Sequence, residues 1–520
     1  IYDGLSATYD YGQYGSELKN NIKEYWWKAI TRLHENIVGI DAAIFMHPTT
    51  WKASGHVDAF NEEQFRATNP NVLRNQEKIN NVEGRMKAAL EASDLVGLKQ
   101  LIEDLEIADP ETGSRNWTEV RQFNLMFSTE LGSVAGDAAT IYLRPETAQG
   151  IFVNFLNVQK SGRMKAALEA SDLVGLKQLI EDLEIADPET GSRNWTEVRQ
   201  FNLMFSTELG SVAGDAATIY LRPETAQGIF VNFLNVQKSG RMKIPFGIAQ
   251  IGKAFRNEII ARQFIFRMRE FEQMEMQFFI KPGTDGEWYN YWKDARIKWH
   301  KSLGMGEENY KFHDHLKLAH YANAACDIEF NFPMGFKELE GIHSRTDFDL
   351  GNHEKFSGKK LRYHETESGE SYVPYVIETS IGLDRMFLAT LTYAYNEETL
   401  EYGSERVVLS IPPALAPVKV AVLPLLNKDG LPEKAREIVD QLKLYFNLQY
   451  DAKDAIGRRY RRQDAIGTPY CITIDHDTLT DHCVTIRERD SMQQERVSIE
   501  RVREMVEAKV SMNTLLAKLA

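Results

Sequence analysis

The sequence contains few of the features on which secreted, membrane-bound or metal-stabilised proteins depend. Its 520 residues include only three cysteines, Cys326, Cys471 and Cys483, and none lies in a CxxC or Cys/His cluster. An odd number of widely spaced cysteines argues against a disulfide framework and a structural zinc site, and is typical of a reducing cytoplasm. No run of 18 or more apolar residues occurs and no signal peptide is recognisable, so neither membrane insertion nor export is expected.

Excess positive charge is also absent. The chain has 61 Lys and Arg residues against 75 Asp and Glu residues, which gives a formal net charge of −14 at pH 7. Nonspecific nucleic-acid binders draw affinity from neutralising phosphates, so this balance argues against that class, although it permits a local basic patch. A hydrophobic content of 43% is typical of a soluble globular protein, and the length predicts two or three domains.

The long repeat in the sequence shows no divergence. Residues 84–161 and 162–239 are identical, with an offset of 162 − 84 = 78 residues. Stacked structural repeats have periods of about 20–50 residues and drifted sequences, so this repeat predicts no solenoid or propeller. Two copies that packed in different places would have diverged, and we therefore expect one copy to be redundant. Function is read from the remaining 520 − 78 = 442 residues.

Hydrophobic periodicity predicts helices mixed with antiparallel strands. Residues 17–36 have helical spacing, and the strand-like run after them ends at Pro48. Residues 244–259 and 265–280 alternate apolar and polar side chains, which predicts two antiparallel strands joined by a loop. Further predictions are a helix or helical hairpin over 84–107, a helix closed by Gly304, strands in 325–333 and 336–350, and a strand with a final helix in 371–395.

Four prolines within residues 407–426 indicate a domain boundary near residue 415. Beyond it, strands and helices alternate, which predicts a small α/β domain of about 100 residues. We expect a catalytic domain over residues 1–415, containing the duplication and a helical insertion at about 284–325. A second domain is expected over residues 416–520.

Two motifs carry residues suited to phosphate chemistry. "FRNE" at 255–258 is followed on the next predicted strand by "FRMREFEQME" at 266–275. Alternate residues of a strand face one side, so these charges form either a hairpin surface with cross-strand ion pairs or a binding site. "ETSIGLDR" at 378–385 places Gly382 before an apolar helix with Arg385 in its first turn. A helix N-terminus beside an arginine suits a phosphate, although the combination is also common elsewhere.

Together with other stretches, these motifs resemble the class II aminoacyl-tRNA synthetases and, within them, the dimeric glycyl-tRNA synthetases. The resemblance runs from Tyr2 to about Asp475 in the family's order. It rests on "YDGLSATYDYGQYGSELKNNIKEYWW", "MHPTTWKASGHVDAF", "LRPETAQGIFVNF", "PFGIAQIGKAFRNEI", "FIFRMREFEQMEMQFF", "ELEGIHSRTDFDL", "PYVIETSIGLDR" and "GRRYRRQDAIGTPYCITID".

The resemblance implies an α+β fold, with a class II antiparallel-sheet catalytic domain and a C-terminal α/β anticodon-binding domain. It implies a ligase that activates glycine with ATP to glycyl-adenylate and transfers glycine to the 3′ end of tRNA(Gly). The glycine carboxylate attacks the α-phosphorus, and positioning and electrostatic stabilisation take the place of a protein nucleophile. The implied cofactors are ATP and Mg²⁺. The implied partners are tRNA(Gly), glycine and a second copy of the chain, in the cytoplasm, with no DNA and no membrane.

For ATP, the family pattern assigns Arg256 to the α-phosphate, Arg385 to the γ-phosphate and Phe271 to stacking on adenine. Arg256, Arg385 and Glu258 are the expected catalytic residues. Mg²⁺ is assigned to Glu338 and Glu378, because carboxylate oxygens suit that ion. The full expected ATP set is Arg256, Asn257, Glu258, Phe266, Arg267, Arg269, Phe271, Glu338, Leu339, Gly382, Asp384 and Arg385.

Glycine offers only an ammonium and a carboxylate, so the resemblance implies an acidic pocket that rejects alanine and serine by steric exclusion. The implied glycine set is Glu224, Arg222, Glu272, Gln273, Glu275, Glu378, Ser380 and Gly382. Arg222 and Glu224 belong to "RPETAQG", which occurs in both copies. We favour the second copy because it is continuous with residues 244–258, and the alternatives are Arg144 and Glu146. From residue types alone, the motif also fits a simple helix start at Pro223.

Four arginines surround a tyrosine in "GRRYRRQD", a pattern that suits phosphates and single-stranded bases as well as an ordinary basic loop. The resemblance makes Arg458, Arg459, Arg461 and Arg462 the expected tRNA-binding residues. Pro48 falls where class II enzymes build a dimer interface, although it would look the same if it only ended a strand. His56 lies near the site in the family, and a buried structural histidine is the alternative.

Two departures from the family pattern bear on activity. The chain opens at Ile1 in what reads as the middle of an element, and the family's "RAD"-like arginine after "GHVDAF" is replaced by a context in which Arg66 is a weak stand-in. We expect residues to be missing before Ile1 and around Asn61, which would impair activity. Two other readings stay open: a synthetase for another small amino acid, and a noncatalytic synthetase-like RNA-binding module.

Overall fold

The structure is a computed structural model that falls into two compact units, Ile1–Phe60 with Asn202–Ala520, and Asn61–Phe201. It describes residues 5–59, 61–64, 128–131, 139–142, 173–182, 199–209, 217–258, 263–316, 318–319, 321–399, 403 and 405–520. No helix within these residues is long and apolar enough to span a lipid bilayer.

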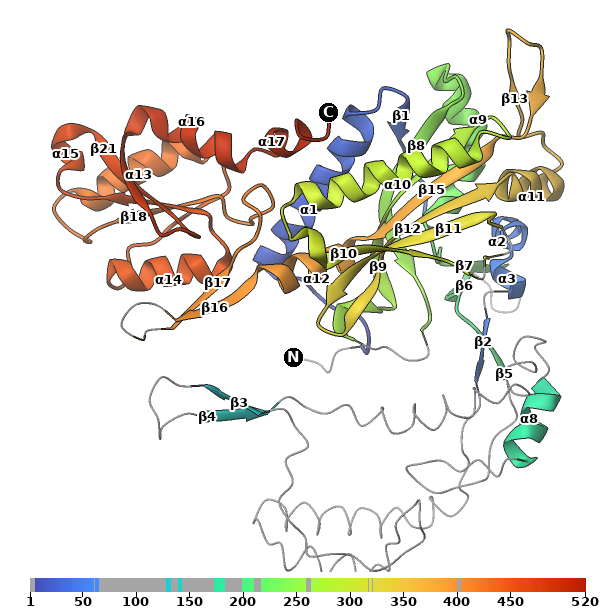
Figure 1. Cartoon of the computed structure of the whole chain (residues 1–520), viewed down its shortest axis with the longest axis horizontal. Coiled ribbons are helices and arrows are strands. Elements are labelled where there is room, and N and C mark those ends of the chain that lie inside the picture. The colour runs from blue at the N-terminus through green and yellow to red at the C-terminus, as the bar shows by residue number, and fades with distance from the viewer. Residues whose placement is uncertain are drawn as a thin grey trace, which may run out of the picture. The chain divides into compact units, whose positions relative to one another are not determined.

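A seven-stranded sheet forms the centre of the first unit (Figure 1). Its order is β1 (Ile37–Gly39), β8 (Phe246–Phe255), β9 (Glu270–Ile280), β15 (Tyr375–Gly382), β12 (Gly335–Thr346), β11 (Ala324–Phe332) and β10 (Tyr310–Asp314). Neighbouring strands are antiparallel except β1, which runs parallel to β8. The predicted α+β class, with an antiparallel sheet in the catalytic part, is confirmed.

The alternation of β9 separates an apolar face of the sheet from a polar one. Met274, Met276 and Phe278 are buried in the main hydrophobic core, whereas Glu275 and Gln277 are buried polar residues. Successive side chains of a strand point to opposite faces. Odd-numbered residues of β9 therefore face away from the main core, and Glu275 faces the cavity described below.

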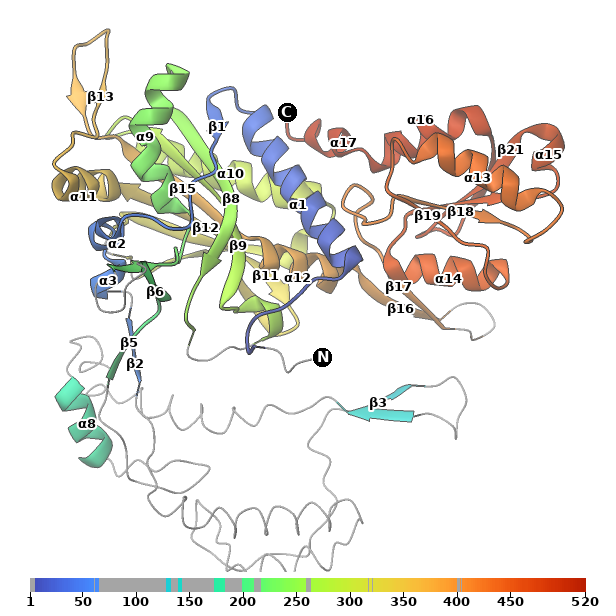
Figure 2. The ribbon, with the colours of Figure 1, turned by 180° about the vertical axis from the view of Figure 1, so that it is seen from behind.

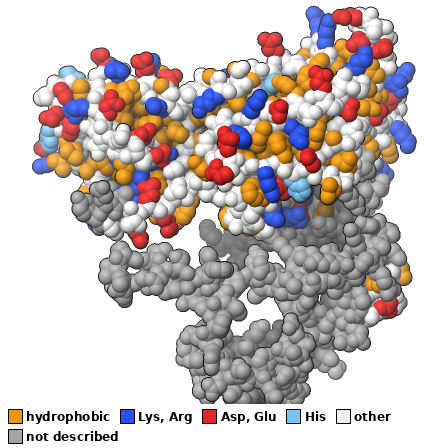
Figure 3. Space-filling view, viewed as in Figure 1, with side chains coloured by type: hydrophobic (Ala, Val, Ile, Leu, Met, Phe, Trp, Pro, Cys, Tyr) orange, Lys and Arg blue, Asp and Glu red, His pale blue; other side chains and the backbone are white. Residues whose placement is uncertain are grey.

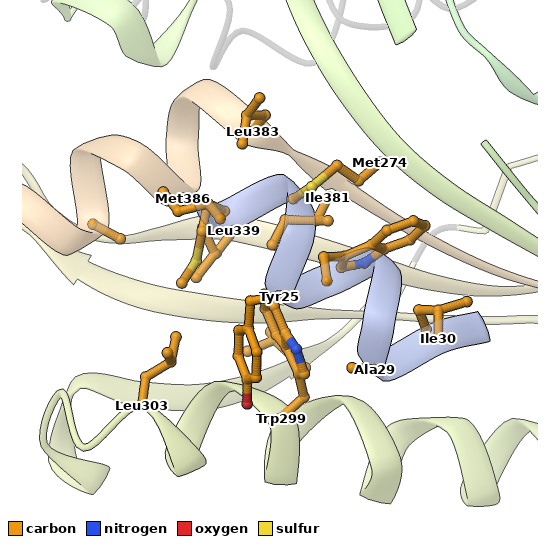
Figure 4. Close-up of a cluster of buried hydrophobic side chains, with 14 of the residues drawn as sticks. Tyr25, Ala29, Ile30, Met274, Trp299, Leu303, Leu339, Ile381, Leu383 and Met386 are labelled. Atoms are coloured by element: carbon orange, nitrogen blue, oxygen red, sulfur yellow. The ribbon is translucent and has the colours of Figure 1, made fainter. Parts of the chain in front are cut away.

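Three helices cover the apolar face: α1 (Gln13–Arg32), α10 (Asp285–Ser302) and α12 (Leu383–Ala394). Figure 4 shows Tyr25 of α1 beside Trp299 of α10, and the two rings are stacked with centroids 5.2 Å apart. Met386 of α12 joins the same cluster. Burying each such side chain contributes roughly 1.5–3 kcal/mol. The core thus fixes α12 against the sheet. The reverse view in Figure 2 shows α1 beside β1 and β8.

The opposite face is covered by α9 (Ala226–Gly240) and α11 (Phe348–Ser357). Phe233 of α9 stacks on Phe246 of β8, with ring centroids 5.8 Å apart, and lies 4.6 Å from the ring of Phe279 on β9. Because α9 comes from the second copy of the repeat, that copy is part of the core of the first unit.

The two copies can be compared where both are described. In the second copy, β6 (Ser206–Leu209) pairs with β7 (Ala217–Tyr220), and in the first copy β3 (Ser128–Leu131) pairs with β4 (Ala139–Tyr142) in the same register. The second unit also contains α8 (Leu173–Asp182) and a pair formed by β2 (Asn61–Gln64) and β5 (Arg199–Asn202). The helix predicted over 84–107 lies outside the described residues.

The C-terminal residues form their own five-stranded sheet and core, as the sequence predicted. A ribbon of β16 (Tyr395–Thr399) and β17 (Glu405–Leu409) precedes it. The sheet has the order β19 (Leu448–Tyr450), β18 (Val420–Pro424), β20 (Tyr470–Ile474), β21 (Cys483–Glu488) and β22 (Gln494–Ser498). Its helices are α13 (Leu431–Leu442), α14 (Ile456–Ile466), α15 (Thr478–Asp481) and α16 (Ile499–Val510), whereas Met512 and Leu516 of the last helix, α17 (Met512–Leu516), are buried in the main core with α1.

Several predicted elements differ from those observed. Pro48 begins α2 (Pro48–Ala53), with the His47 ring accepting from the Thr49 N–H at the cap, and α3 (His56–Ala59) follows. The region predicted as a helical insertion contains α10, a 3₁₀ turn η2 (Glu307–Asn309) and β10, which pairs with β11 in the main sheet. The predicted strand over 265–280 begins only at Glu270, after a 3₁₀ turn η1 (Phe264–Phe266). β13 (Tyr363–His364) and β14 (Ser371–Tyr372) form a small antiparallel hairpin.

Candidate active site

A cavity of about 200 Å³ lies over the polar face of β9, β12 and β15, beside the start of α12. One end is lined by arginines and aromatic rings, and the other by buried carboxylates. The lining residues are Glu224, Arg256, Glu258, Ile265, Phe266, Arg267, Met268, Phe271, Gln273, Glu275, Tyr321, Glu338, Gly341, His343, Arg345, Glu378, Ser380, Gly382, Asp384 and Arg385.

Arg256 and Phe271 form one wall of the arginine-rich end. Arg256 follows β8, and its backbone N–H donates to the Arg269 carbonyl at 2.9 Å. Its guanidinium lies 5.2 Å from the centroid of the Phe271 ring, and its Nε donates to the Pro223 carbonyl at 3.1 Å. The hydrogen bond to Pro223 fixes Arg256 beside the start of α9.

Arg385 forms the facing wall. It lies in the first turn of α12, and its guanidinium is 4.3 Å from the centroid of the Phe266 ring. Its Nη1 is 2.9 Å from Glu338 Oε2, and the charge of Arg385 is the main reason that the pKa of Glu338 is lowered. Two arginines and two phenylalanines thus converge where a planar base and an anion could both be held.

The loop between β8 and β9 is held by its own charged residues. Glu258 is buried, with an Oε2 that lies 3.4 Å from Arg267 Nη1. Arg269 donates through Nε and Nη2 to the Glu258 carbonyl, and through Nη1 to the Ser6 carbonyl at 3.1 Å. Arg269 therefore fixes the loop and does not line the cavity, contrary to its predicted contact with ATP.

Three glutamates from different elements meet at the acidic end. Glu224 precedes α9, Glu275 lies on β9 and Glu378 on β15, and each is buried or nearly so. Glu275 accepts hydrogen bonds from the hydroxyls of Thr225 and of Ser380, the latter at 2.8 Å. The β9–β15 register places Glu275 directly opposite Ser380.

The three carboxyl groups have different pKa values because their partners differ. Burial raises the pKa of Glu275 to about 8, and the charges of Glu378 and Glu224 add to this effect. Burial also acts to raise the pKa of Glu224, but the charges of His56 and Arg345 outweigh it, and the pKa is well below its usual range. For Glu378, Arg345 and a hydrogen bond from His343 outweigh burial and lower the pKa to about 2.

Sequence reasoning gave no role to several residues of this acidic end. Arg345 donates to Glu378 Oε2 at 2.9 Å and makes two hydrogen bonds to Asp349, and its guanidinium lies 4.1 Å from the centroid of the Tyr321 ring. His343 Nδ1 is 2.8 Å from Glu378 Oε1. The two residues lie in "HSR", within a stretch that carried the resemblance. Their i, i+2 spacing on a strand was the signal that could have placed both on the cavity face.

His56 lies near the acidic end, as the resemblance implied. Its Nε2 is 3.4 Å from Glu224 Oε2, and its Nδ1 is 2.8 Å from Ser54 Oγ. Gln227 donates to Glu224 Oε1 at 2.9 Å and to Asp349 at 3.1 Å. The carboxylate of Glu224 is therefore held in place from both sides.

Some predicted glycine contacts lie elsewhere. Arg222 is buried, and its guanidinium donates to the backbone carbonyls of Lys253 and Ala42, so it supports the backbone and does not line the cavity. Glu272 points to the opposite face of β9 from Glu275, where it pairs with Lys19 and Lys23. Strand alternation is the physical reason, because residues 272 and 275 have opposite parity.

Some predicted ATP contacts also lie elsewhere. Leu339 is buried in the main hydrophobic core, and Asn257 donates its backbone N–H to the Leu203 carbonyl without lining the cavity. Asp384 borders the cavity, but its carboxylate accepts hydrogen bonds from Tyr11, Lys19 and the Glu272 backbone. The remaining members of the predicted ATP and glycine sets line the cavity.

Glu338 and Glu378, the residues assigned to Mg²⁺, both line the cavity. Glu338 pairs with Arg385, whereas Glu378 pairs with His343 and Arg345, so the two carboxylates have separate partners. Within the part of the chain that the structure describes, no group of three or more His, Cys, Asp or Glu residues could hold a metal ion.

The four arginines of "GRRYRRQD" have different roles in α14. Arg459 is 2% exposed, and its guanidinium donates to the carbonyls of Pro424, Leu425 and Asp451, so its predicted contact with tRNA is replaced by a structural one. Arg462 pairs with Asp451 and Asp454. Arg458 and Arg462 are exposed and Arg461 is half-buried, with its Nη1 3.9 Å from Asp464 Oδ2, because a helix places only some residues of a basic run on its outer face.

Acidic and basic side chains are interspersed over the visible face of the first unit (Figure 3). The predicted stand-in Arg66 and the first-copy residues Arg144 and Glu146 lie outside the described residues. The second-copy residues Arg222 and Glu224 are described, and Glu224 lines the cavity.

Family models match most of the chain. The tRNA synthetase class II core domain (G, H, P, S and T) matches residues 211–394, and an anticodon binding domain matches residues 419–509. Glycyl-tRNA synthetase insertion domain 1 matches residues 43–125 and 153–203. The class II core match contains α9, β8, β9, β12, β15 and α12, which together surround the cavity.

Curated relatives match over nearly the full length. A glycine–tRNA ligase from Chlorobaculum tepidum is 46% identical over 511 residues, which cover 98% of this chain and 96% of the relative. Those from Staphylococcus haemolyticus and Macrococcus caseolyticus are 45% and 44% identical, with 98% of this chain covered in each case and 95% and 94% of the relatives. By this similarity and by its three matching domains, the chain belongs to the glycine–tRNA ligase family of class II aminoacyl-tRNA synthetases.

Proposed function

We propose that glycine and ATP react in the cavity over β9, β12 and β15, and that the products are glycyl-adenylate and pyrophosphate. As a member of its family, the chain is a ligase that charges tRNA with glycine and uses ATP. The observation that carries the proposed site is the division of one cavity into an arginine and aromatic end and a buried carboxylate end. The first suits a nucleotide, and the second suits an amino acid that offers only its charged groups.

At the nucleotide end, we assign Arg256 to the α-phosphate. Its Nε donates to the Pro223 carbonyl and its guanidinium lies 5.2 Å from the centroid of the Phe271 ring, so Arg256 is held at the arginine-rich end of the cavity. Negative charge grows on the α-phosphate as the glycine carboxylate attacks, so a fixed cation there lowers the barrier. Phe271 is assigned to the adenine ring, and Glu258 to the loop that holds it.

Arg385 is assigned to the terminal phosphate. It pairs with Glu338, whose side chain is 51% exposed. A phosphate is a doubly charged bidentate acceptor, so it can displace this half-exposed partner at small cost. Mg²⁺ is proposed to enter with ATP, with phosphate oxygens as its main ligands, and no step is assigned to a Glu338–Glu378 pair.

At the carboxylate end, Glu224 and Glu378 are assigned to the glycine ammonium. Both are ionised at neutral pH by their low pKa values, and His56, His343 and Arg345 hold them in place. Ser380 and Gln273 are assigned to orienting the substrate beside Glu275. Alanine and serine would need space for a Cβ in a wall already occupied by these side chains.

The tRNA is proposed to contact the C-terminal domain over residues 416–520, with Arg458 and Arg462 as the exposed members of the basic run. A boundary near residue 415 is supported by the separate core of that domain. We further propose a homodimer, supported by β1, a strand at one edge of the main sheet. The three free cysteines agree with a cytoplasmic location.

The test is ATP–pyrophosphate exchange with glycine, alanine and serine supplied separately and without tRNA. Exchange with glycine alone is expected, because activation needs only the cavity. Exchange with alanine or serine at a comparable rate would contradict the assignment of the carboxylate end. Exchange with none of the three would favour a noncatalytic module. Size-exclusion chromatography with light scattering tests the dimer separately.

A further inference from the structure

A buried lysine connects the two elements that carry the nucleotide end of the cavity. Lys19 lies on α1, and its Nζ is 2.7 Å from Glu272 Oε2 on β9 and 2.8 Å from Asp384 Oδ1 on α12. Its side chain is 10% exposed. A charge so well covered is stable only when it is paired, so this position binds three elements together.

Asp384 is the centre of this arrangement. Its Oδ2 accepts the backbone N–H of Glu272 at 2.9 Å, and its Oδ1 accepts the Tyr11 hydroxyl at 2.5 Å as well as Lys19. Burial, followed by the charge of Asp384, raises the pKa of Tyr11, which therefore remains a donor at neutral pH. Three donors, from Tyr11, Lys19 and the backbone of β9, thus hold this carboxylate.

The neighbours of these residues face the cavity. Glu272 lies between Phe271 and Gln273 on β9, and Asp384 directly precedes Arg385 on α12. The hydrogen bond from the Glu272 backbone to Asp384 therefore sets the spacing between Phe271 on one wall and Arg385 on the other. Lys19 lies between the carboxylates of Glu272 and Asp384 and offsets part of their negative charge.

We propose that Lys19 is a positioning residue for ATP, and that it acts through Asp384 to hold Arg385 at the correct distance from Phe271. Lys19 itself does not line the cavity, but lines a second pocket that Phe271 and Asp384 also border. The inference rests on ATP binding in the cavity and is independent of which amino acid is activated.

Lys23 provides a matched control. It lies one turn along α1, and its Nζ is 3.2 Å from Glu272 Oε1, but among the residues that the structure describes it forms no ion pair with Asp384. Replacing Lys19 with methionine keeps the aliphatic stem and removes the charge, and K23M makes the same change at a partner of Glu272 alone. Only K19M removes a partner of Asp384.

The experiment measures ATP affinity of the full chain by isothermal titration calorimetry, and the KM values for ATP and glycine by pyrophosphate exchange. K19M is expected to weaken ATP binding about tenfold or more, since displacement by about 1 Å can cost up to roughly a hundredfold, with the KM for glycine little changed. K23M is expected to stay within about threefold of wild type, and K19R to recover most of the loss.

Equal ATP affinity in K19M and K23M, or equal increases in both KM values, would overturn the proposal, since a purely structural role predicts no preference for ATP. If K19M does not fold, Y11F replaces it, because that change removes one donor to Asp384 and keeps the ring. A wild-type chain that binds ATP without exchange would contradict the proposed function but still allow the ATP affinities to decide the role of Lys19.

Discussion

Glu224, Glu275 and Glu378 illustrate how three identical side chains in one pocket acquire different charges. Arginine and histidine partners keep Glu224 and Glu378 ionised, whereas Glu275 has hydroxyl partners and two anionic neighbours. Its pKa of about 8 means that it is mostly protonated at pH 7. The pocket therefore avoids three like charges before the ammonium of glycine arrives.

This protonation predicts how stability depends on pH. Glu275 has a raised pKa in the folded state, so between about pH 4.3, the unfolded value, and about 8 the folded chain binds more protons than the unfolded one. Its contribution to stability therefore falls as pH rises through that window. We expect E275Q to flatten the decrease in Tm between pH 6 and pH 8, measured by differential scanning fluorimetry.

E272Q is the matched control for that experiment. Burial acts to raise the pKa of Glu272, but its lysine partners outweigh it and the net pKa is lowered, so Glu272 is ionised in both states between pH 6 and pH 8. The Tm slope of E272Q should equal that of wild type. An unchanged slope in E275Q would mean that Glu275 is ionised in the free protein.

Arg256 gives a prediction for the chemical step. R256A removes the fixed cation beside the α-phosphate, and the rate of adenylate formation is expected to fall by at least about a hundredfold. Single-turnover formation of the adenylate measures this directly. R458A, on the outer face of α14, should leave adenylate formation unchanged. Near-wild-type turnover of R256A would contradict the assignment of the nucleotide end.

At the scale of elements, the sequence was most informative where a pattern continues over a whole helix or strand. The helix of residues 285–302 ends before Gly304, which has φ +73° and suits glycine. The two predicted strands extend too far into the loop between them: residues 256–258 and 265–269 continue the alternation, but they lie outside β8 and β9, and the chain turns through η1. Hydrogen bonds from Arg269 to Glu258 and Ser6 decide its course, and such partners have no local signal.

The candidate site likewise contains residues that the sequence pattern places correctly and residues whose position depends on tertiary contacts. The odd-numbered residues Phe271, Gln273 and Glu275 of β9 line the cavity, and the even-numbered Glu272 does not. The resemblance assigned all four to substrate binding because it matched the motif as a continuous stretch. Arg459 was expected to contact tRNA, but it is buried, and its guanidinium donates to the backbone carbonyls of Pro424, Leu425 and Asp451. Tertiary contacts of this kind cannot be read from spacing alone.

The start of α9 provides an experiment with an internal control. Glu224 and Glu146 have identical local sequences, but Glu224 lines the cavity. E224Q is expected to raise the KM for glycine at least about tenfold, the scale of a lost charged hydrogen bond, with a much smaller effect on the KM for ATP. E146Q should match wild type. The reverse pattern in pyrophosphate exchange would show that the first copy forms the site.

At the scale of the whole molecule, the duplication predicts the result of a deletion. Removing residues 84–161 leaves one copy and shortens the segment between Phe60 and Asn202 from 141 to 141 − 78 = 63 residues. Loop-closure entropy changes by only about 0.6 kcal/mol for each halving of length, and the shorter segment is favoured. We expect glycine-dependent exchange to be retained and Tm to be equal or slightly higher.

A loss of exchange in the deleted chain, with Tm unchanged, would mean that the longer segment contributes to catalysis. Deletion of residues 162–239 produces the same sequence, so the outcome does not depend on which copy is removed. The prediction therefore tests redundancy itself.

The helix that carries Arg385 continues directly into β16, and β17 returns beside it to the C-terminal domain. Arg406 of β17 is buried, donates to Asp464 of α14 at 2.9 Å and also pairs with Glu398. Arg487 of β21 bonds the same aspartate. These contacts connect α14, through β17 and β16, to the C-terminal end of α12, so a load on α14 under the proposed tRNA contact would reach the helix that carries Arg385.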